Sequence, residues 1–373
     1  SNVVGSGSFT IPMMKKLGYK PEFAGAVEAS ASTGGQIMPP IMGAAAFLMA
    51  EFLGIKYTDV VKSAIIPAIL YFVGVFMGVH FEAKKLGLKG TPRDQLPKFS
   101  YILIQEGHLL LPLIAIIYLL VSGFSLQFVA LGSIIIAIVA SFFRKSTRIS
   151  LKDFFEALEK GARSALGVAT ACATAGIIVG VVTKTGLGLK LASALIVIAS
   201  NLAVSIGGVI QSVRSFFYNL VGVTYSANPE MLISSLKIIF TLFMAMLTSI
   251  ILGMGVPTTA NYIITSTIAA PALLLLSVKP IAAHMFVFYF GIIADITPPV
   301  ALAAYAGAAI AKADPFKTGV TATRLSIGAF IVPYMFVLAP QLLLLGGSFW
   351  HIILSIITSI IGMTAVSASL TGY

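Results

Sequence analysis

Apolar runs of about 20 residues recur along this sequence, and such a run is what an α-helix needs to cross the hydrocarbon core of a bilayer. Of the 373 residues, 58% are hydrophobic and only 10% are charged, whereas about 25% of residues are charged in soluble domains. We therefore predict an all-α integral membrane protein with roughly ten transmembrane helices. The expected spans are 22–50, 60–81, 108–125, 127–143, 164–182, 188–206, 232–253, 280–306, 320–342 and 349–368.

Basic residues gather in two loops, 84–98 and 144–163, and the turn between them at 122–125 carries no charge. By the positive-inside rule both loops face the cytoplasm, so we expect a multi-pass protein of the cell (inner) membrane. Because the basic residues fall mostly in short loops between spans, the net charge of +11 does not indicate nucleic-acid binding. Residues 151–163 predict an amphipathic helix at the cytoplasmic interface. For residues 207–231 a loop, an interfacial helix and a re-entrant segment all remain open.

Two parts of the chain repeat each other at a constant separation of 259 residues, without gaps. Chance similarity between apolar segments readily matches Leu, Ala and Val, but it rarely keeps an asparagine and several prolines in register. We therefore predict an internal repeat. The matched residues are Asn2 and Asn261, Pro12 and Pro271, Lys20-Pro21 and Lys279-Pro280, Ile37 and Ile296, Pro39-Pro40 and Pro298-Pro299, and Ala44-Ala45 and Ala303-Ala304.

Each copy of the repeat contains two segments that proline interrupts. Proline removes a backbone donor and clashes with the preceding turn, so a double proline should break a helix at membrane depth. Broken backbone is tolerated there only where protein or a hydrated cavity satisfies it, and paired broken segments mark the midplane site of secondary transporters. Free carbonyls suit a hard cation such as sodium, and half-helix N-termini suit an anion. The alternative is that the prolines only kink helices for packing.

An odd number of spans, seven on the predicted boundaries, separates the two Gly/Ser-rich segments. The second copy is therefore expected to be inverted, with one re-entrant helical hairpin entering from each side of the membrane.

The chain resembles the large membrane subunit of tripartite ATP-independent periplasmic (TRAP) transporters, in the fused-permease branch that uses TAXI-type binding proteins. The resemblance is carried by SNVVGSGSFTIPMMKKLGYKPEFAGAVEASASTGGQIMPPIMGAAAF, GMGVPTTANYIITSTIAAPALL, AAHMFVFYFGIIADITPPVALAAYAGAAIA and DPFKTGVTATRLSIGAFIVPYMF. It implies a fragment of an elevator-type transporter that lacks its N-terminal part. The resemblance further implies sodium-driven uptake of a small organic anion (a carboxylate), a periplasmic substrate-binding protein, and a small membrane subunit, separate or fused upstream. No cofactor is implied beyond the coupling ions.

The resemblance also implies a division of the chain. Residues 1–57 and 253–312 would each form half of a mobile transport domain, with one hairpin and one broken helix. Residues 58–252 would form scaffold and connecting helices, and residues 313–373 C-terminal transmembrane helices.

Mapped onto this sequence, the resemblance places two sodium sites and a substrate site at the broken segments. The first sodium site would involve Ser1, Asn2 and Gly5, facing Gly34, Gly35, Met38 and Pro39. The second would involve Thr258 and Asn261, facing Ala294, Asp295, Thr297 and Pro298. Many of these residues would bind through carbonyl oxygens. Substrate would contact Ser6, Ser32, Thr33 and Thr265.

Two carboxylates lie inside apolar runs. Asp295 corresponds to Gln36 in the first copy, and a carboxylate at mid-bilayer costs roughly 2.5–3.5 kcal/mol on insertion scales, which favours a cation- or proton-linked role. For Glu28 a structural and a functional role are both open. The four histidines lack metal-ligand spacing, the single Cys172 excludes disulfides, and no catalytic motif is visible, so we do not expect an enzyme.

Three other functions remain as alternatives at this point. The first is a two-hairpin elevator carrier that takes divalent organic anions without a binding protein. An intramembrane enzyme would need a catalytic pair, and a channel would need a continuous polar face. Polar residues instead cluster at the two repeats.

Overall fold

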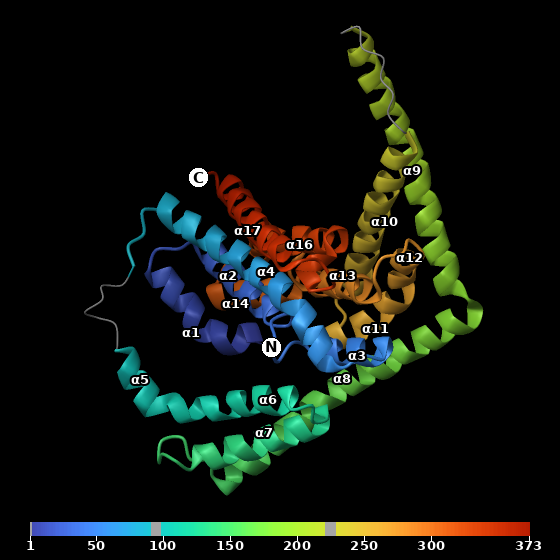
Figure 1. Cartoon of the computed structure of the whole chain (residues 1–373). Helices are drawn as coiled ribbons and strands as arrows, with labels where there is room; N and C mark the ends of the chain where they lie inside the picture. Colours follow the sequence, from blue (N-terminus) through green and yellow to red (C-terminus); the bar gives the residue numbers. More distant parts are fainter. Residues whose placement is uncertain (1, 91–97, 221–228) are drawn as a thin grey trace.

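The computed structural model describes residues 2–90, 98–220 and 229–373, and within these ranges the chain is helical with no strand. In this part of the chain, 7 helical segments are long and apolar enough to cross a membrane. They are α4 (Tyr57–Lys85), Ser100–Val121 in α5 and α6 (Phe99–Glu106 and Leu111–Val121), α8 (Leu151–Thr185), α9 (Leu187–Leu220), α10 (Pro229–Gly253), α15 with α16 (Pro315–Leu325 and Ile327–Leu338), and α17 (Phe349–Thr371). The protein is therefore a multi-pass membrane protein (Figure 1).

The remaining expected spans are shorter apolar helices. α7 covers Leu126–Ser141, and each double-proline run is divided into two helices. The first run forms α2 (Pro21–Gly34) and α3 (Ala45–Leu53), and the second forms α13 (Pro280–Ile293) and α14 (Leu302–Ala311). Proline therefore breaks both runs where the sequence predicted.

The predicted amphipathic helix at 151–163 and the span at 164–182 form one continuous helix, α8. Its start is fixed by a capping box, in which the Ser150 hydroxyl accepts from the Asp153 amide and the Asp153 carboxylate accepts from the Ser150 amide. Residues 207–220 continue α9, and α10 begins at Pro229. Residues 221–228, the middle of the segment left open by the sequence, lie outside the described ranges. Figure 1 shows α9 and α10 side by side, with one end of the pair standing out from the rest of the molecule, while α10 also packs against α13.

The repeat is present in the backbone. α2 and α13 have 14 residues each and begin and end at corresponding positions. Gly18 and its counterpart Ser277 both have positive φ, at 105° and 61°. So do Met42 and Ala301, at 38° and 35°, a conformation that L-residues rarely adopt. The Pro39-Pro40 and Pro298-Pro299 bonds are cis in both copies. Register predicted from sequence alone is thus reproduced in local geometry.

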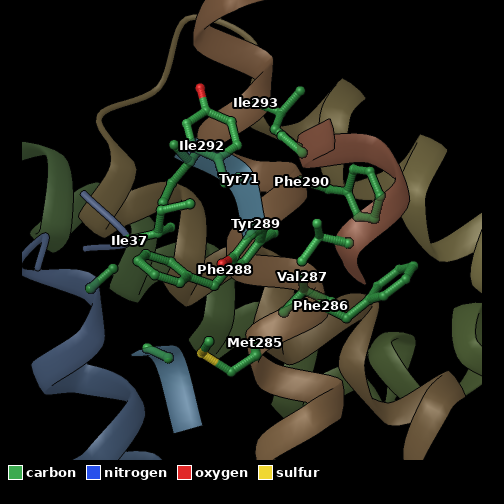
Figure 2. Packing of buried hydrophobic residues seen from close by; sticks show 14 of the residues in the cluster. Ile37, Tyr71, Met285, Phe286, Val287, Phe288, Tyr289, Phe290, Ile292 and Ile293 are labelled. Carbon is green, nitrogen blue, oxygen red and sulfur yellow. The ribbon is translucent and has the colours of Figure 1, made fainter. Parts of the chain in front are cut away.

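The two matched helices are packed differently. Every residue of α13 from Ala282 to Ile293 is buried. Its aromatic side chains pack against rings of α16. Tyr289 meets the ring of Phe336 and Phe290 meets Tyr334, both edge to face. Figure 2 shows the bulky side chains of α13, Tyr289 and Phe290 among them, with Ile37 from the first copy and Tyr71 from α4 nearby. The buried face of α2 instead consists mostly of small residues.

A buried group of hydroxyls connects α2 to α4 and α16. Tyr71 donates to the carbonyl oxygen of Ser30 at 2.7 Å, and the Ser326 hydroxyl lies 2.7 Å from that of Ser30. Because these groups are removed from water, each bond they form avoids a desolvation penalty. This group therefore fixes the first broken helix against the helices that follow it.

Candidate substrate and cation site

A cavity of about 480 Å³ lies between the two copies of the repeat. Its size is in the range of small-molecule sites. The first copy contributes the end of α2 and the break after it, and the second contributes the break after α13, the start of α14 and the segment before α11 (Thr258–Ile268). The lining residues are Val3, Ser32, Thr33, Gln36, Gly43, Gly255, Val256, Pro257, Thr258, Asp295, Leu302, Ala303 and Ala306.

The double prolines account for the position of this cavity. α2 and α13 both end shortly before their prolines, so that Gln36 lies in a turn and Asp295, its counterpart in the repeat, lies in a short 3-10 turn (Ala294–Ile296). A side chain in such a break can face a cavity instead of a neighbouring helix. Gln36 and Asp295 do so from opposite copies, and both line the same space.

The described residues that line the cavity present oxygen atoms and no cationic side chain. Oε1 of Gln36 is buried and has no hydrogen-bond partner among the described residues. Asp295 is half-buried, and no hydrogen bond or ion pair to its carboxylate is found in the described ranges. No Lys, Arg or His is among the described lining residues. A buried acceptor without a donor is unfavourable, so the site is complementary to a cation or a donor that enters it.

Asn261 occupies a second polar position beside the break of α13. Its side chain is 1% exposed, and Nδ2 donates to the carbonyl oxygen of Gly291 at 2.7 Å. The other amide atom, Oδ1, is buried without a partner in the described part of the chain. A Cβ on Gly253 or Gly291 would lie 2.5 Å or 2.9 Å from Nδ2, so both glycines are required for the amide to fit. Oδ1 is the type of hard oxygen ligand that sodium takes.

Glu28 fastens α1 (Asn2–Lys16) to α2. Its carboxylate, 6% exposed, accepts from the hydroxyls of Ser6 and Thr10 on α1 and of Ser32 on α2, at 2.5, 2.5 and 3.2 Å. Ser32 also lines the cavity, so this carboxylate orients one of its polar groups. Burial among hydroxyl donors is how an intramembrane carboxylate is tolerated.

The structure places the predicted site residues in three groups. Ser32, Thr33, Thr258 and Asp295 line the cavity. Ser6 donates to Glu28, and Thr265 donates back to the Asn261 carbonyl within α11, so neither lines the cavity. The others lie in the same broken segments or on α1 without lining it: Gly5, Gly34, Gly35, Met38, Pro39, Asn261, Ala294, Thr297 and Pro298. Ser1 and the side chain of Asn2 lie outside what the structure describes.

Gln36 lines the cavity but was not predicted as a site residue, and the role of the nearby Glu28 was left open by the sequence. Gln36 could have been found from the sequence, because it occupies the repeat position of Asp295. The role of Glu28 in holding α1 could not, because its three hydroxyl partners come from two helices whose relative placement depends on tertiary packing.

The fold and the cavity together define a class: a multi-pass helical membrane protein with a polar site between two proline-broken repeats, the architecture of secondary transporters. The family described as tripartite ATP-independent periplasmic transporter, DctM component, matches residues 1–351, and the chain belongs to this family. The resemblance to the large membrane subunit of TRAP transporters is thereby confirmed. Members of the family work with a periplasmic binding protein and a small membrane component. A search of curated proteins found no match.

Proposed function

We propose that this chain moves a small organic carboxylate across the inner membrane together with sodium ions, in an elevator motion. The observation that carries the proposal is the chemistry of the 480 Å³ cavity, which offers hydroxyl, amide and carboxylate oxygens and, among the described residues, no basic side chain. A carboxylate entering beside Asp295 meets a like charge in a poorly hydrated space. Sodium ions that enter with it offset this repulsion, so the substrate and the ions bind favourably only together.

The sodium ligands we propose are the two sets derived from the repeat. Around the second break, Asn261 would supply its buried Oδ1, which has no partner among the described residues. Carbonyl oxygens of residues 294–298, which follow the end of α13, would complete the set. The first set is the corresponding one around Asn2 and residues 34–39. The Asp295 carboxylate then acts from the cavity side, adding negative charge near the second ion.

We propose that the two copies move together as the transport domain and that they are inverted. α1 and α2 pack against α14, so that the first and second copies share one packed unit. An odd number of apolar helical segments separates α1 from α11: the broken helix α2–α3, then α4, α5–α6, α7, α8, α9 and α10. This count supports opposite orientations of the two copies in the membrane.

Uptake into proteoliposomes tests the proposal. The chain would be reconstituted with its small membrane component and its binding protein, and accumulation of radiolabelled succinate, glutamate and glucuronate would be followed with sodium or potassium outside. We expect accumulation of at least one compound only with inward sodium and with the binding protein. Equal accumulation in potassium would contradict sodium coupling, and uptake without the binding protein would favour the carrier that takes divalent anions directly.

A further inference from the structure

A second polar cavity, of about 290 Å³, lies apart from the substrate cavity and shares no lining residue with it. It is formed where α2 begins, where α4 and α17 end, and beside α15. Its polar and charged lining residues are Lys20, Glu22, Glu82, Lys85, Thr321, Arg324, Ser367 and Thr371. On the orientation given by the basic loop that follows α4, this is the cytoplasmic face of the membrane.

The charges in this cavity are not paired with one another. The ion pairs found within the described ranges join Lys62 to Asp59, Lys160 to Glu156 and Arg163 to Glu159, all outside the cavity. Lys85 donates to the carbonyl oxygen of Thr371 and so caps α17. Lys20 and Arg324 remain as cations, and Glu22 and Glu82 as carboxylates, facing one space from three helices.

Arg324 is the least expected of these residues, because it lies well inside a helical segment that is apolar enough to cross the membrane. It is the tenth residue of α15, about 14 Å along the helix from Pro315, inside a segment that meets the criteria for a membrane span. α15 packs along α2, where Thr318 lies beside Gly25. An arginine at such a depth needs water or an anion, and its long side chain can reach toward the interface.

The start of α2 adds to the attraction for an anion. Pro21 occupies its first turn, and Lys20 at the cap position makes no side-chain capping bond. The first amides of the helix are therefore available to an acceptor that enters the cavity. An anion alone, however, would leave Glu22 and Glu82 facing a like charge. A ligand that carries both a phosphate and an ammonium group matches both signs.

We propose that this cavity binds the phosphoethanolamine headgroup of an aminophospholipid from the cytoplasmic leaflet. The phosphate would lie between Arg324, Lys20 and the first amides of α2, and the ammonium would donate to Glu82 and Glu22. The cavity lies where α4 and α17 end on the side assigned to the cytoplasm, and lipid headgroups lie at such helix ends, which makes the bilayer the source of the ligand. A bound headgroup would join the first broken helix to α4, α15 and α17, and so stabilise their packing.

Thermal unfolding of the purified, delipidated protein tests this proposal without sodium or substrate, so its outcome is independent of the transport proposal. The probes are phosphatidylethanolamine, phosphatidylcholine and phosphatidylglycerol in mixed micelles. We expect phosphatidylethanolamine to raise the Tm by about 3 °C or more over phosphatidylcholine, whose quaternary ammonium has no N–H to donate. Equal shifts with all three lipids would overturn the proposal.

Point variants test which side chains bind the phosphate and the ammonium of the headgroup. Arg324→Gln should abolish the response to phosphatidylethanolamine, and Glu82→Gln should remove its advantage over phosphatidylglycerol, whereas Lys62→Gln, an exposed control on α4, should change neither. If Arg324→Gln does not fold, Glu82→Gln alone decides: an unchanged lipid preference overturns the proposal. Full stabilisation by soluble O-phosphoethanolamine, without lipid, would overturn the bilayer as the source, and inorganic phosphate should give none.

Discussion

Gly25 of α2 and Gly307 of α14 bring two broken helices, one from each copy of the repeat, into backbone contact. A Cβ built on Gly307 would stand 2.6 Å from the carbonyl oxygen of Gly25, closer than any real side-chain carbon approaches. Small residues permit such close crossing of membrane helices, whose association depends on packing. The two halves of the cavity are held together by this crossing.

Gly307→Ala should therefore separate α2 from α14. We expect a loss of stability of about 1–3 kcal/mol, as in overpacked cores, seen as a lower Tm of the purified protein. Gly176→Ala is the matched control, because a Cβ at this helical position meets nothing within 4 Å. If both variants have the wild-type Tm, the close crossing does not stabilise the protein.

Asn261→Ala removes the buried oxygen that we assign to the second sodium site. We expect the sodium concentration for half-maximal thermal stabilisation to rise by about tenfold or more, because a neutral ligand oxygen is lost from a preformed site. Potassium should stabilise neither protein. Asn201→Ala, at an exposed position of α9, is the control. An unchanged sodium response would remove Asn261 from the site.

Asp295→Asn keeps the shape of the cavity side chain and removes its charge. Because the carboxylate adds negative charge beside the proposed ion, the variant should need more sodium for half-maximal uptake, by about tenfold, at an unchanged fold. Sodium titration of uptake in proteoliposomes measures this. Sodium dependence equal to that of the wild type would argue that the carboxylate acts on the substrate or not at all.

Glu28→Gln weakens the attachment of α1 to α2. The amide accepts through one oxygen where the carboxylate accepts through two, so one or more of the hydroxyls of Ser6, Thr10 and Ser32 loses its acceptor. We expect a loss of about 1–3 kcal/mol in stability. Glu51→Gln on the exposed surface of α3 should have little effect. A double-mutant cycle with Thr10→Val measures the coupling, and additive effects would contradict a direct interaction.

Tyr71→Phe tests the buried group of hydroxyls that connects α2 to α4 and α16. Removal of the Tyr71 hydroxyl leaves the buried carbonyl of Ser30 without this donor, which should lower stability by about 1–3 kcal/mol. Tyr118→Phe, on an exposed ring, is the control. Equal Tm values for the two variants would show that the buried bond contributes no net stability.

Local and periodic features of the fold were predictable from the sequence. Apolar runs gave the membrane helices, and the double prolines gave the breaks after α2 and α13, because proline acts on its own turn. The resemblance and the position of Asp295 inside an apolar run placed this residue in the site. Boundaries without a local stop signal were not predictable: α8 continues from the amphipathic segment into the span, and α9 continues to Leu220.

Tertiary partners were the other part that sequence could not supply. Nothing local to Asn261 indicates that Gly253 and Gly291 make room for it, and nothing local to Thr265 indicates that its hydroxyl turns back to its own helix. Such contacts join residues from separate helices or depend on rotamers chosen by packing, so only the assembled structure shows them.

The two 14-residue helices of the repeat also imply opposite mutational tolerance. On α13, where Phe286, Phe288 and Phe290 are buried, replacing a large side chain by a small one opens a void. On α2, where Ala24, Gly25 and Ala26 are buried, the damaging change is the addition of volume. Two helices with the same length and register would therefore accept different substitutions at equivalent positions.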